Sequence, residues 1–317
     1  MTDGIEVVRH AELIPCRSAF IDAHTPGSDQ KENYTIIGAG VSESPDQHVH
    51  IKRTPGFNIG AAAQPARCTN SLHSHRTAEV FIIHTGVWRF FWGVDGGAGE
   101  VVLHPGDIVN LPTHMFRGFA NITALTDDNP TGYGFMFAVL GGDDAGGGVL
   151  WAPQVLHDAK AHGLVLLENG RLVDTKQGET VPADVAPMQP MGPAEIAVYD
   201  RNRITDETKA VYRAGSGPSG TVEGIIGDGF RLHDRPGFNL FRLQADTAIT
   251  HALIGAQETV LICGAGTVMV GEQTLSAGDT AYLAAGPDRT ASLSAGAVLH
   301  IVEPTDDPAG ASHILEV

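Results

Sequence analysis

Three residues between positions 73 and 79 have the types and the spacing of metal ligands. His73 and His75 are one residue apart, and Glu79 follows four residues after the second histidine. Successive side chains of a β-strand point to opposite faces, so both imidazoles would lie on one face. A short turn would then bring Glu79 beside them. Two imidazoles and one carboxylate form a ligand triad that suits non-haem Fe(II), and Mn, Ni or Zn would also fit these donors.

The segments that must position these residues are short and punctuated by glycine. The runs EVFIIHTG, VWRFFWG and EVVLHPGDIVNLP are rich in β-branched and aromatic residues and predict strands joined by hairpins. Many short strands without a helical period indicate a sandwich or barrel, because closure or double layering protects the sheet edges. The 39 glycines and 18 prolines also favour an all-β fold.

The order of these signals occurs twice along the chain. The hexapeptide RTPGFN at 53–58 is echoed by DRPGFN at 234–239, and each copy is followed by strand-like runs and then by a Gly-Asp pair. A repeat of this kind predicts the duplication of one domain.

The repeat divides the chain into four parts. APQVLHDAKAHG has apolar residues at helical spacing, and LENGRLVD has an Asn-Gly pair that favours a hairpin. We therefore expect an N-terminal arm (1–45) that packs on the barrels, followed by a first barrel (46–150). A connection with a short helix and a hairpin (151–190) then leads to a second barrel (191–317).

The stretch from His73 to Gly86 resembles the first motif of the cupin superfamily, and the stretch from Gly106 to Asn121 is similar to its second motif. The resemblance implies a bicupin, which consists of tandem double-stranded β-helix barrels of jelly-roll type with a ligand site inside the barrel. In the second copy the first motif is reduced to His251 and Glu258, so we expect that barrel to be degenerate and metal-free.

The sequence departs from the family pattern at three positions. Arg67 and His114 stand where the motifs have glycine, and Arg117 stands where a fourth metal-binding histidine is usual. A guanidinium cannot donate a lone pair to a cation. Three explanations are open: Arg117 binds an anionic group of the substrate beside a three-ligand metal, it pairs with Glu79 in a metal-free pocket, or His114 becomes the substitute ligand.

The resemblance and the donor set together predict a metal-dependent enzyme, with Fe(II) favoured. A dioxygenase acting on a small anionic substrate comes first, with Glu79 and Arg117 as catalytic residues. If Phe81, Met115 and Phe116 line the site, the substrate is also partly apolar or aromatic. A metal-dependent lyase or isomerase would use the same donors. The alternative from another class is a metal-free bicupin that binds or senses a small acidic ligand.

The net charge limits the classes of molecule that the protein is expected to bind. Thirty-seven acidic against twenty basic residues give a net charge of -17, which argues against binding to nucleic acid or anionic lipid. The start of the sequence lacks a signal-peptide pattern, and no 18-residue apolar stretch occurs, so a cytoplasmic location is expected. A small molecule is the expected partner. A homodimer is a further expectation, since cupin barrels commonly pair through sheet edges.

Overall fold

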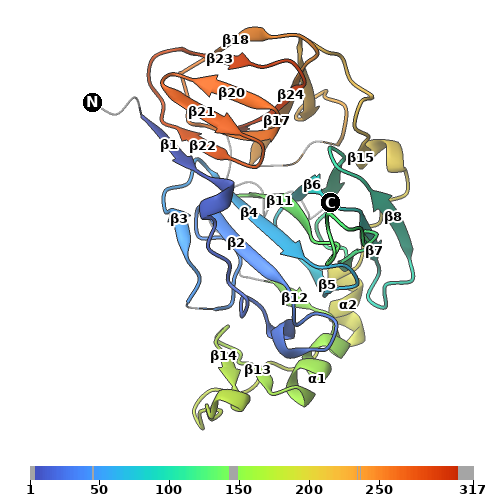
Figure 1. Cartoon of the computed structure of the whole chain (residues 1–317). Helices are drawn as coiled ribbons and strands as arrows, with labels where there is room; N and C mark the ends of the chain where they lie inside the picture. Colours follow the sequence, from blue (N-terminus) through green and yellow to red (C-terminus); the bar gives the residue numbers. More distant parts are fainter. Residues whose placement is uncertain (1–3, 45, 143–148, 234, 236, 306–317) are drawn as a thin grey trace.

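The protein folds into two β-barrels, each built from two sheets. The computed structural model describes residues 4–44, 46–142, 149–233, 235 and 237–305. In Figure 1, barrel 2 lies at the top in orange and red, barrel 1 lies beneath it, and a small helical and hairpin layer lies at the bottom. The expected all-β architecture of tandem barrels with a short helical segment in the connection is confirmed.

Barrel 1 is built from a seven-stranded and a five-stranded sheet. In order of hydrogen-bonded neighbours, the seven-stranded sheet contains β15 (Val211–Tyr212), β9 (Ile108–Leu111), β6 (Glu79–Thr85), β11 (Gly134–Gly141), β4 (Phe57–Gln64), β2 (Glu32–Ile37) and β3 (Val49–Ile51). The five-stranded sheet contains β12 (Leu150–Trp151), β5 (Thr69–Ser74), β10 (Arg117–Asn121), β7 (Trp88–Trp92) and β8 (Gly99–Leu103).

Barrel 2 is built from a six-stranded and a four-stranded sheet. The six-stranded sheet contains β1 (Ile5–Val8), β22 (Thr280–Leu283), β19 (Thr259–Ala265), β24 (Ala297–Pro304), β17 (Phe238–Ala245) and β16 (Val222–Ile226). The four-stranded sheet contains β18 (Ile249–Leu253), β23 (Arg289–Leu293), β20 (Thr267–Val270) and β21 (Gln273–Ser276).

The connecting segments exchange strands between the barrels. The N-terminal arm supplies β1 to the sheet of barrel 2 and then β2 to the sheet of barrel 1. After the connection, β15 pairs with β9 of barrel 1 before the strands of barrel 2 begin. The arm and the region after residue 190 are therefore shared between both barrels.

The connection contains both of the elements expected from its sequence. Helix α1 (Pro153–Ala161) is followed by a hairpin of β13 (Leu164–Leu166) and β14 (Leu172–Asp174), and helix α2 (Pro193–Tyr199) comes next. The short 3-10 helices are η1 (His10–Glu12), η2 (Ile21–His24), η3 (Thr175–Gln177) and η4 (Glu207–Lys209). Over the described residues, no helix has the length and apolarity needed to cross a membrane.

The largest sheets of the two barrels pack against each other through their outer faces. On β6, Phe81 and Ile83 point into barrel 1, whereas Val80 and Ile82 point into a core shared with barrel 2. Both faces of this strand are buried, which explains why its sequence is an almost continuous apolar run.

The repeated Pro-Gly-Phe motif meets itself across this interface. Phe57 and Phe238 begin equivalent strands, and their rings lie 6.2 Å apart between the barrels. Gly56 and Gly237 have φ angles of 94° and 103°, a backbone conformation that favours glycine. The motif therefore turns the chain into the first strand of each barrel and supplies one ring to the shared core. Asp234 and Pro236 of the second copy lie outside the described residues.

Replacing Phe137 by Ala tests whether the shared core holds the barrels together. Phe137 is 1% exposed in that core, so its loss should lower the free energy of unfolding by about 3–5 kcal/mol, measured by urea titration. Leu125→Ala, at a site that is 55% exposed, is the control and should change it by less than about 0.5 kcal/mol. Equal effects would contradict this role of the shared core.

Candidate metal centre

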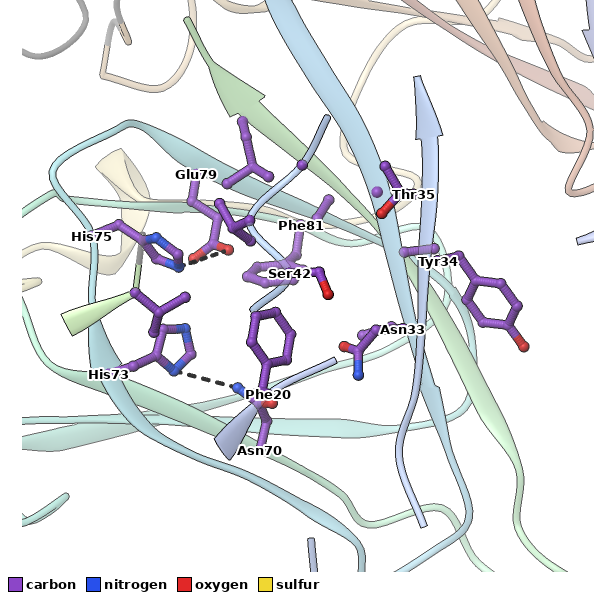
Figure 2. Close-up of a pocket in the computed structure, with 18 of the residues that line it drawn as sticks. Phe20, Asn33, Tyr34, Thr35, Ser42, Asn70, His73, His75, Glu79 and Phe81 are labelled. Carbon is purple, nitrogen blue, oxygen red and sulfur yellow. Dashed lines mark hydrogen bonds and ion pairs between the residues drawn. The ribbon is translucent and has the colours of Figure 1, made fainter. Parts of the chain in front are cut away.

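The structure brings His73, His75 and Glu79 together at one end of barrel 1. His73 lies on β5, His75 follows the end of that strand, and Glu79 begins β6. Each residue offers a donor atom, and these atoms all lie within 4.8 Å of one another. All three side chains are buried, and Figure 2 shows them at one side of a cavity. These three residues could hold a metal ion.

Both imidazoles are neutral at physiological pH. Burial, followed by the charge of Arg117, lowers the pKa of His73 to about 3. The same two causes, with a smaller effect of His73, hold the pKa of His75 well below its ordinary value. A neutral imidazole keeps a lone pair that a cation can bind.

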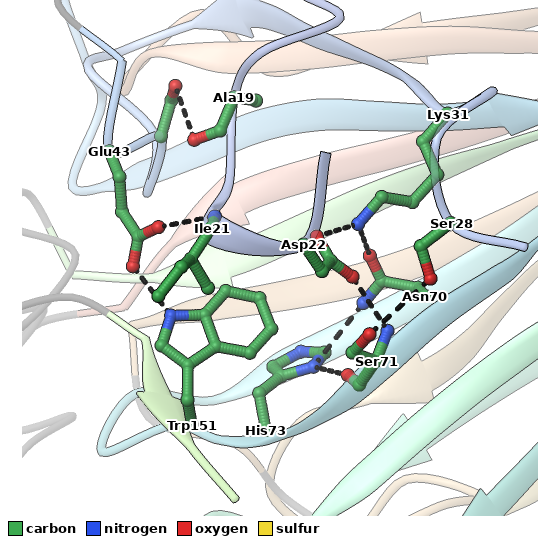
Figure 3. A network of polar contacts seen from close by, with 11 residues as sticks. Ala19, Ile21, Asp22, Ser28, Lys31, Glu43, Asn70, Ser71, His73 and Trp151 are labelled. Atoms are coloured by element: carbon green, nitrogen blue, oxygen red, sulfur yellow. Dashed lines mark hydrogen bonds and ion pairs between the residues drawn. The ribbon is translucent and has the colours of Figure 1, made fainter. Parts of the chain in front are cut away.

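A buried polar network sets the orientation of His73 (Figure 3). Nδ1 of His73 lies 2.7 Å from the backbone oxygen of Ser71 and donates to it, which leaves the lone pair on Nε2. Nδ2 of Asn70 lies 3.3 Å from the same Nδ1, and since both atoms are donors this is a packing contact. The hydrogen bond to Ser71 is of the kind that fixes the ring and the tautomer of metal-binding histidines.

The N-terminal arm anchors this network through a buried ion pair. Lys31 pairs with Asp22 and donates a hydrogen bond of 3.0 Å to Oδ1 of Asn70. Oδ2 of Asp22 accepts a hydrogen bond of 3.1 Å from the backbone N–H of Ser71. The arm therefore contacts the residues that orient His73, although Asp22 and Lys31 are far from His73 in the sequence.

Arg117 is bound to the carboxylate of Glu79. Its Nε and Nη2 donate to Oε2 of Glu79 at 3.1 and 2.6 Å, and its Nη1 donates to the backbone oxygen of Met115 at 3.2 Å. The guanidinium is 1% exposed. Of the three explanations for Arg117, the geometry matches the pairing with Glu79. The other carboxylate oxygen, Oε1, lies 3.6 Å from Nε2 of His75 and stays clear of the guanidinium.

The two positions at which the family has glycine keep a left-handed backbone. Arg67 has a φ of 71° and His114 a φ of 53°, and among the described residues they alone combine a side chain with a positive φ. The motif turns therefore persist without their glycines, at a conformational cost. His114 stacks on Tyr199 of α2, with ring centroids 5.5 Å apart, and is not part of the three-residue donor group in the described region.

The cavity beside the three donors has a volume of about 70 Å³ and a mainly apolar wall. In Figure 2, Phe20 and Phe81 face its centre, while the ring of Tyr34 points away from the donors. Further parts of the wall come from Phe119 and Trp151. Polar groups reach it from Asn33, Thr35, Ser42 and Asn70.

The other residues expected to bind substrate lie elsewhere. Met115 packs in the core of barrel 1, and Phe116 packs with the cluster around Trp151 and α1. Neither they nor Arg117 belong to the cavity wall over the residues that the structure describes. Their contact with substrate stays a prediction, and of the three aromatic and sulfur-containing candidates only Phe81 is brought to the cavity.

The comparisons with known proteins agree in fold. Bacterial pirin YhhW from Escherichia coli, in complex with nickel(II), is 11% identical, with 95% of this chain and 99% of pirin covered at a TM-score of 0.50. A variant of Bacillus subtilis oxalate decarboxylase OxdC is 10% identical, with 95% and 77% covered at 0.52. Vicilin from hazelnut, Corylus avellana, is 9% identical, with 94% and 85% covered at 0.51.

The chain has the fold of these neighbours, the bicupin fold. No protein-family model matches the sequence, and no curated protein does so. At identities of 9–11%, the likeness shows the fold and leaves the activity to be argued from the site.

The second barrel of this bicupin differs from the first at the corresponding place. Glu258 accepts a hydrogen bond from the hydroxyl of Tyr282. His251 instead lines a separate cavity together with Gln257 and Glu303. Across the described chain, the donor group in barrel 1 is the one place where three potential ligands gather.

Glu43, which the sequence analysis did not predict as a site residue, has a buried carboxyl group close to the candidate metal centre. Its oxygens accept hydrogen bonds from Nε1 of Trp151 at 2.6 Å and from the N–H of Ile21 at 2.9 Å. Burial raises the pKa of Glu43 to about 7. Because Trp151 also contacts the ring of His73, Glu43 supports one wall of the cavity from behind.

The ion pair between Arg117 and Glu79 can be tested in protein stripped of metal with a chelator. Arg117→Met leaves a buried carboxylate without its partner and should cost about 3–5 kcal/mol of unfolding free energy. The double variant Glu79→Gln/Arg117→Met should cost less than the sum of the single changes. Arg89→Met, in an exposed pair with Glu100, is the control. Strictly additive effects would contradict a coupled pair.

Glu43→Gln should change how stability depends on pH. The folded carboxyl group has a pKa of about 7 against an ordinary 4.5, so it binds more protons than the unfolded chain between these values. Its contribution is complete below pH 4.5 and is lost as the pH rises to about 7. The stability of the wild type relative to the variant should therefore fall by about 3 kcal/mol over this range. Parallel pH profiles from urea unfolding would contradict this, and the exposed Glu272→Gln is the control.

Proposed function

We propose that His73, His75 and Glu79 hold a divalent cation and that barrel 1 is a metal-dependent enzyme for a small substrate in the adjoining cavity. The observation that supports this best is the gathering of three buried donors within 4.8 Å, beside a mainly apolar cavity. The geometry adds two features that suit a cation: neutral imidazoles and an oriented His73.

The position of His75 fits a shared ion better than a hydrogen bond. Nε2 of His75 and Oε1 of Glu79 are 3.6 Å apart, which is too long for a good hydrogen bond. Two atoms that each lie about 2.1 Å from one ion are about 3.0–3.6 Å apart at angles of 90–120°. A cation would therefore give Nε2 of His75 a partner that the distant carboxylate oxygen does not.

Fe(II) is the favoured ion, because two histidines and one carboxylate are the usual ligands of non-haem iron oxygenases. Mn, Ni and Zn remain alternatives, and the pirin neighbour was seen with nickel(II). When bound, such an ion polarises a coordinated oxygen, and Fe(II) can also exchange electrons with O2. We therefore favour a dioxygenase-type oxidoreductase. Lyase or isomerase chemistry is the alternative, and the oxalate decarboxylase neighbours favour it.

The surrounding residues would select and hold the substrate. Phe20, Phe81 and Trp151 offer an apolar and aromatic wall for its body, while Ser42 and Asn33 offer hydrogen bonds. A water molecule needs about 10–15 Å³ on the scale of this cavity, so about 70 Å³ accommodates on the order of five water-sized groups. A small acid with a short alkyl body fits these limits. Arg117 would act on it through Glu79, by holding Oε2 and leaving Oε1 free.

A second candidate is a metal-free bicupin that binds a small acidic ligand. The ion pair of Arg117 with Glu79 favours it, because the carboxylate already has a cationic partner. Two observations weigh against it: the wall of the cavity, over the described residues, contains no Lys or Arg to bind an acid, and the 3.6 Å between Nε2 of His75 and Oε1 of Glu79 suits a shared ion.

Metal content separates the two candidates. Protein purified without chelator should contain close to one equivalent of iron, manganese, nickel or zinc per chain, measured by inductively coupled plasma mass spectrometry. His75→Ala should retain less than about a tenth of an equivalent. His251→Ala, the matched histidine of barrel 2, should retain as much metal as the wild type. Absence of metal from the wild type even after reconstitution would sink the enzyme proposal.

Oxygen dependence then separates the reaction classes. Protein loaded with Fe(II) should consume O2 with a substrate from a panel of small aromatic and aliphatic acids, followed with an oxygen electrode and by mass spectrometry. His75→Ala should lower the rate at least 100-fold. Turnover of an acid that continues unchanged without O2 would replace the dioxygenase with a lyase or isomerase.

A further inference from the structure

A second cavity lies between the two barrels, on the opposite face of β6 from the metal centre. It has a volume of about 360 Å³. Strand β6 of barrel 1 and strands β17, β19 and β24 of barrel 2 contribute to its wall. Four polar side chains with nitrogen atoms line it, namely His84, Arg242, Gln244 and His300.

The sheet register places these groups side by side. Arg242 on β17 lies opposite His300 on β24, and His300 lies opposite Ile262 on β19. All three belong to the face of barrel 2 that is turned toward barrel 1. His84 reaches the same space from barrel 1, because it alternates on β6 with the inward-facing Ile83.

Arg242 is a buried charge without a carboxylate partner. It is 4% exposed, and no ion pair to it occurs over the described residues. Its Nη2 donates to Gln244 at 2.7 Å, and its guanidinium lies over the ring of Tyr212, 5.4 Å from the centroid. Its Nε is buried and unpartnered in the described region. Buried charges are normally paired, so this guanidinium lacks the anion that its position calls for.

The neighbouring groups do not supply that anion. Glu223 lies opposite Arg242 on β16, but it pairs with Arg231 and accepts a hydrogen bond from Tyr212. His84 and His300 each have a buried Nδ1 without a partner over the described chain. Burial is the main cause that lowers their pKa values, to about 4 and about 3, so both rings are neutral at pH 7. The cavity therefore presents one positive charge.

We propose that this inter-barrel cavity binds a small organic carboxylate, with its anionic group on Arg242 and His300 and its hydrocarbon part between the barrels. The apolar body would contact Ile82, Phe137, Ile262 and Val298, which form much of the wall. A single guanidinium matches the single charge of a carboxylate, whereas a phosphate dianion would leave part of its charge uncompensated. This site does not depend on a metal in barrel 1.

Benzoate is a suitable probe, with inorganic phosphate in parallel. Isothermal titration calorimetry on chelator-treated protein should show one benzoate site per chain. Arg242→Gln should weaken the Kd for benzoate at least ten-fold, because it removes the only formal charge among the described residues that line the cavity. Val298→Phe keeps Arg242 but fills the space, so it should weaken the Kd to a similar extent. His75→Ala is the matched control in the metal centre and should leave the Kd unchanged.

The location can also be determined directly. Crystals of wild-type protein soaked with 4-bromobenzoate should give an anomalous bromine signal between β6 and β24, and this result does not require any variant to fold. The proposal is overturned if benzoate fails to bind the folded protein, if its Kd is unchanged in both cavity variants, or if bromine appears only elsewhere. Tighter binding of phosphate than of benzoate at Arg242 would overturn the assigned ligand class. Because His75→Ala abolishes only the metal centre, failure of either proposal is distinguishable from failure of the other.

Discussion

The packing of the two largest sheets, outer face against outer face, is the constraint on which the rest of the molecule depends. It buries both sides of β6, so that one strand presents Glu79 and Phe81 to the inside of barrel 1 and Ile82 and His84 to the space between the barrels. The alternation of a single strand thus contributes to both the candidate metal centre and the inter-barrel cavity. The exchange of β1, β2 and β15 between the sheets ties both faces to the same structure.

Burial also makes every charge near these sites costly unless it has a partner. Barrel 1 meets this requirement twice, with Arg117 on Glu79 and with Lys31 on Asp22. Both pairs support the proposed ligands: Arg117 holds one oxygen of the ligand Glu79, and the pair of Lys31 with Asp22 supports the network that orients His73. Arg242 differs, since it has no carboxylate of its own over the described residues. The contrast between paired and unpaired buried cations is what distinguishes a supporting ion pair from a potential anion site.

The bicupin fold by itself leaves the activity open, because its structural neighbours include a pirin, an oxalate decarboxylase and a vicilin. The function therefore has to be argued from the three donors, the neutral imidazoles and the small apolar cavity. Arg117 is the informative departure from the family pattern. It stands where a fourth ligand is usual and instead holds the carboxylate of Glu79. Any metal here would therefore have three protein donors and several positions left for substrate.

The amino-acid sequence by itself determined the fold class, the duplication and the three donors, because each of these depends on local order: strand alternation, turn residues and the spacing of motif positions. Only the tertiary structure decided which oxygen of Glu79 Arg117 binds, that Met115 and Phe116 pack away from the cavity, and that Asp22, Lys31 and Glu43 stand behind the site. No local pattern marks these residues, since they reach the site from the arm through long-range contacts. The same holds for Arg242 and His84, which become neighbours only when two barrels far apart in the sequence pack face to face.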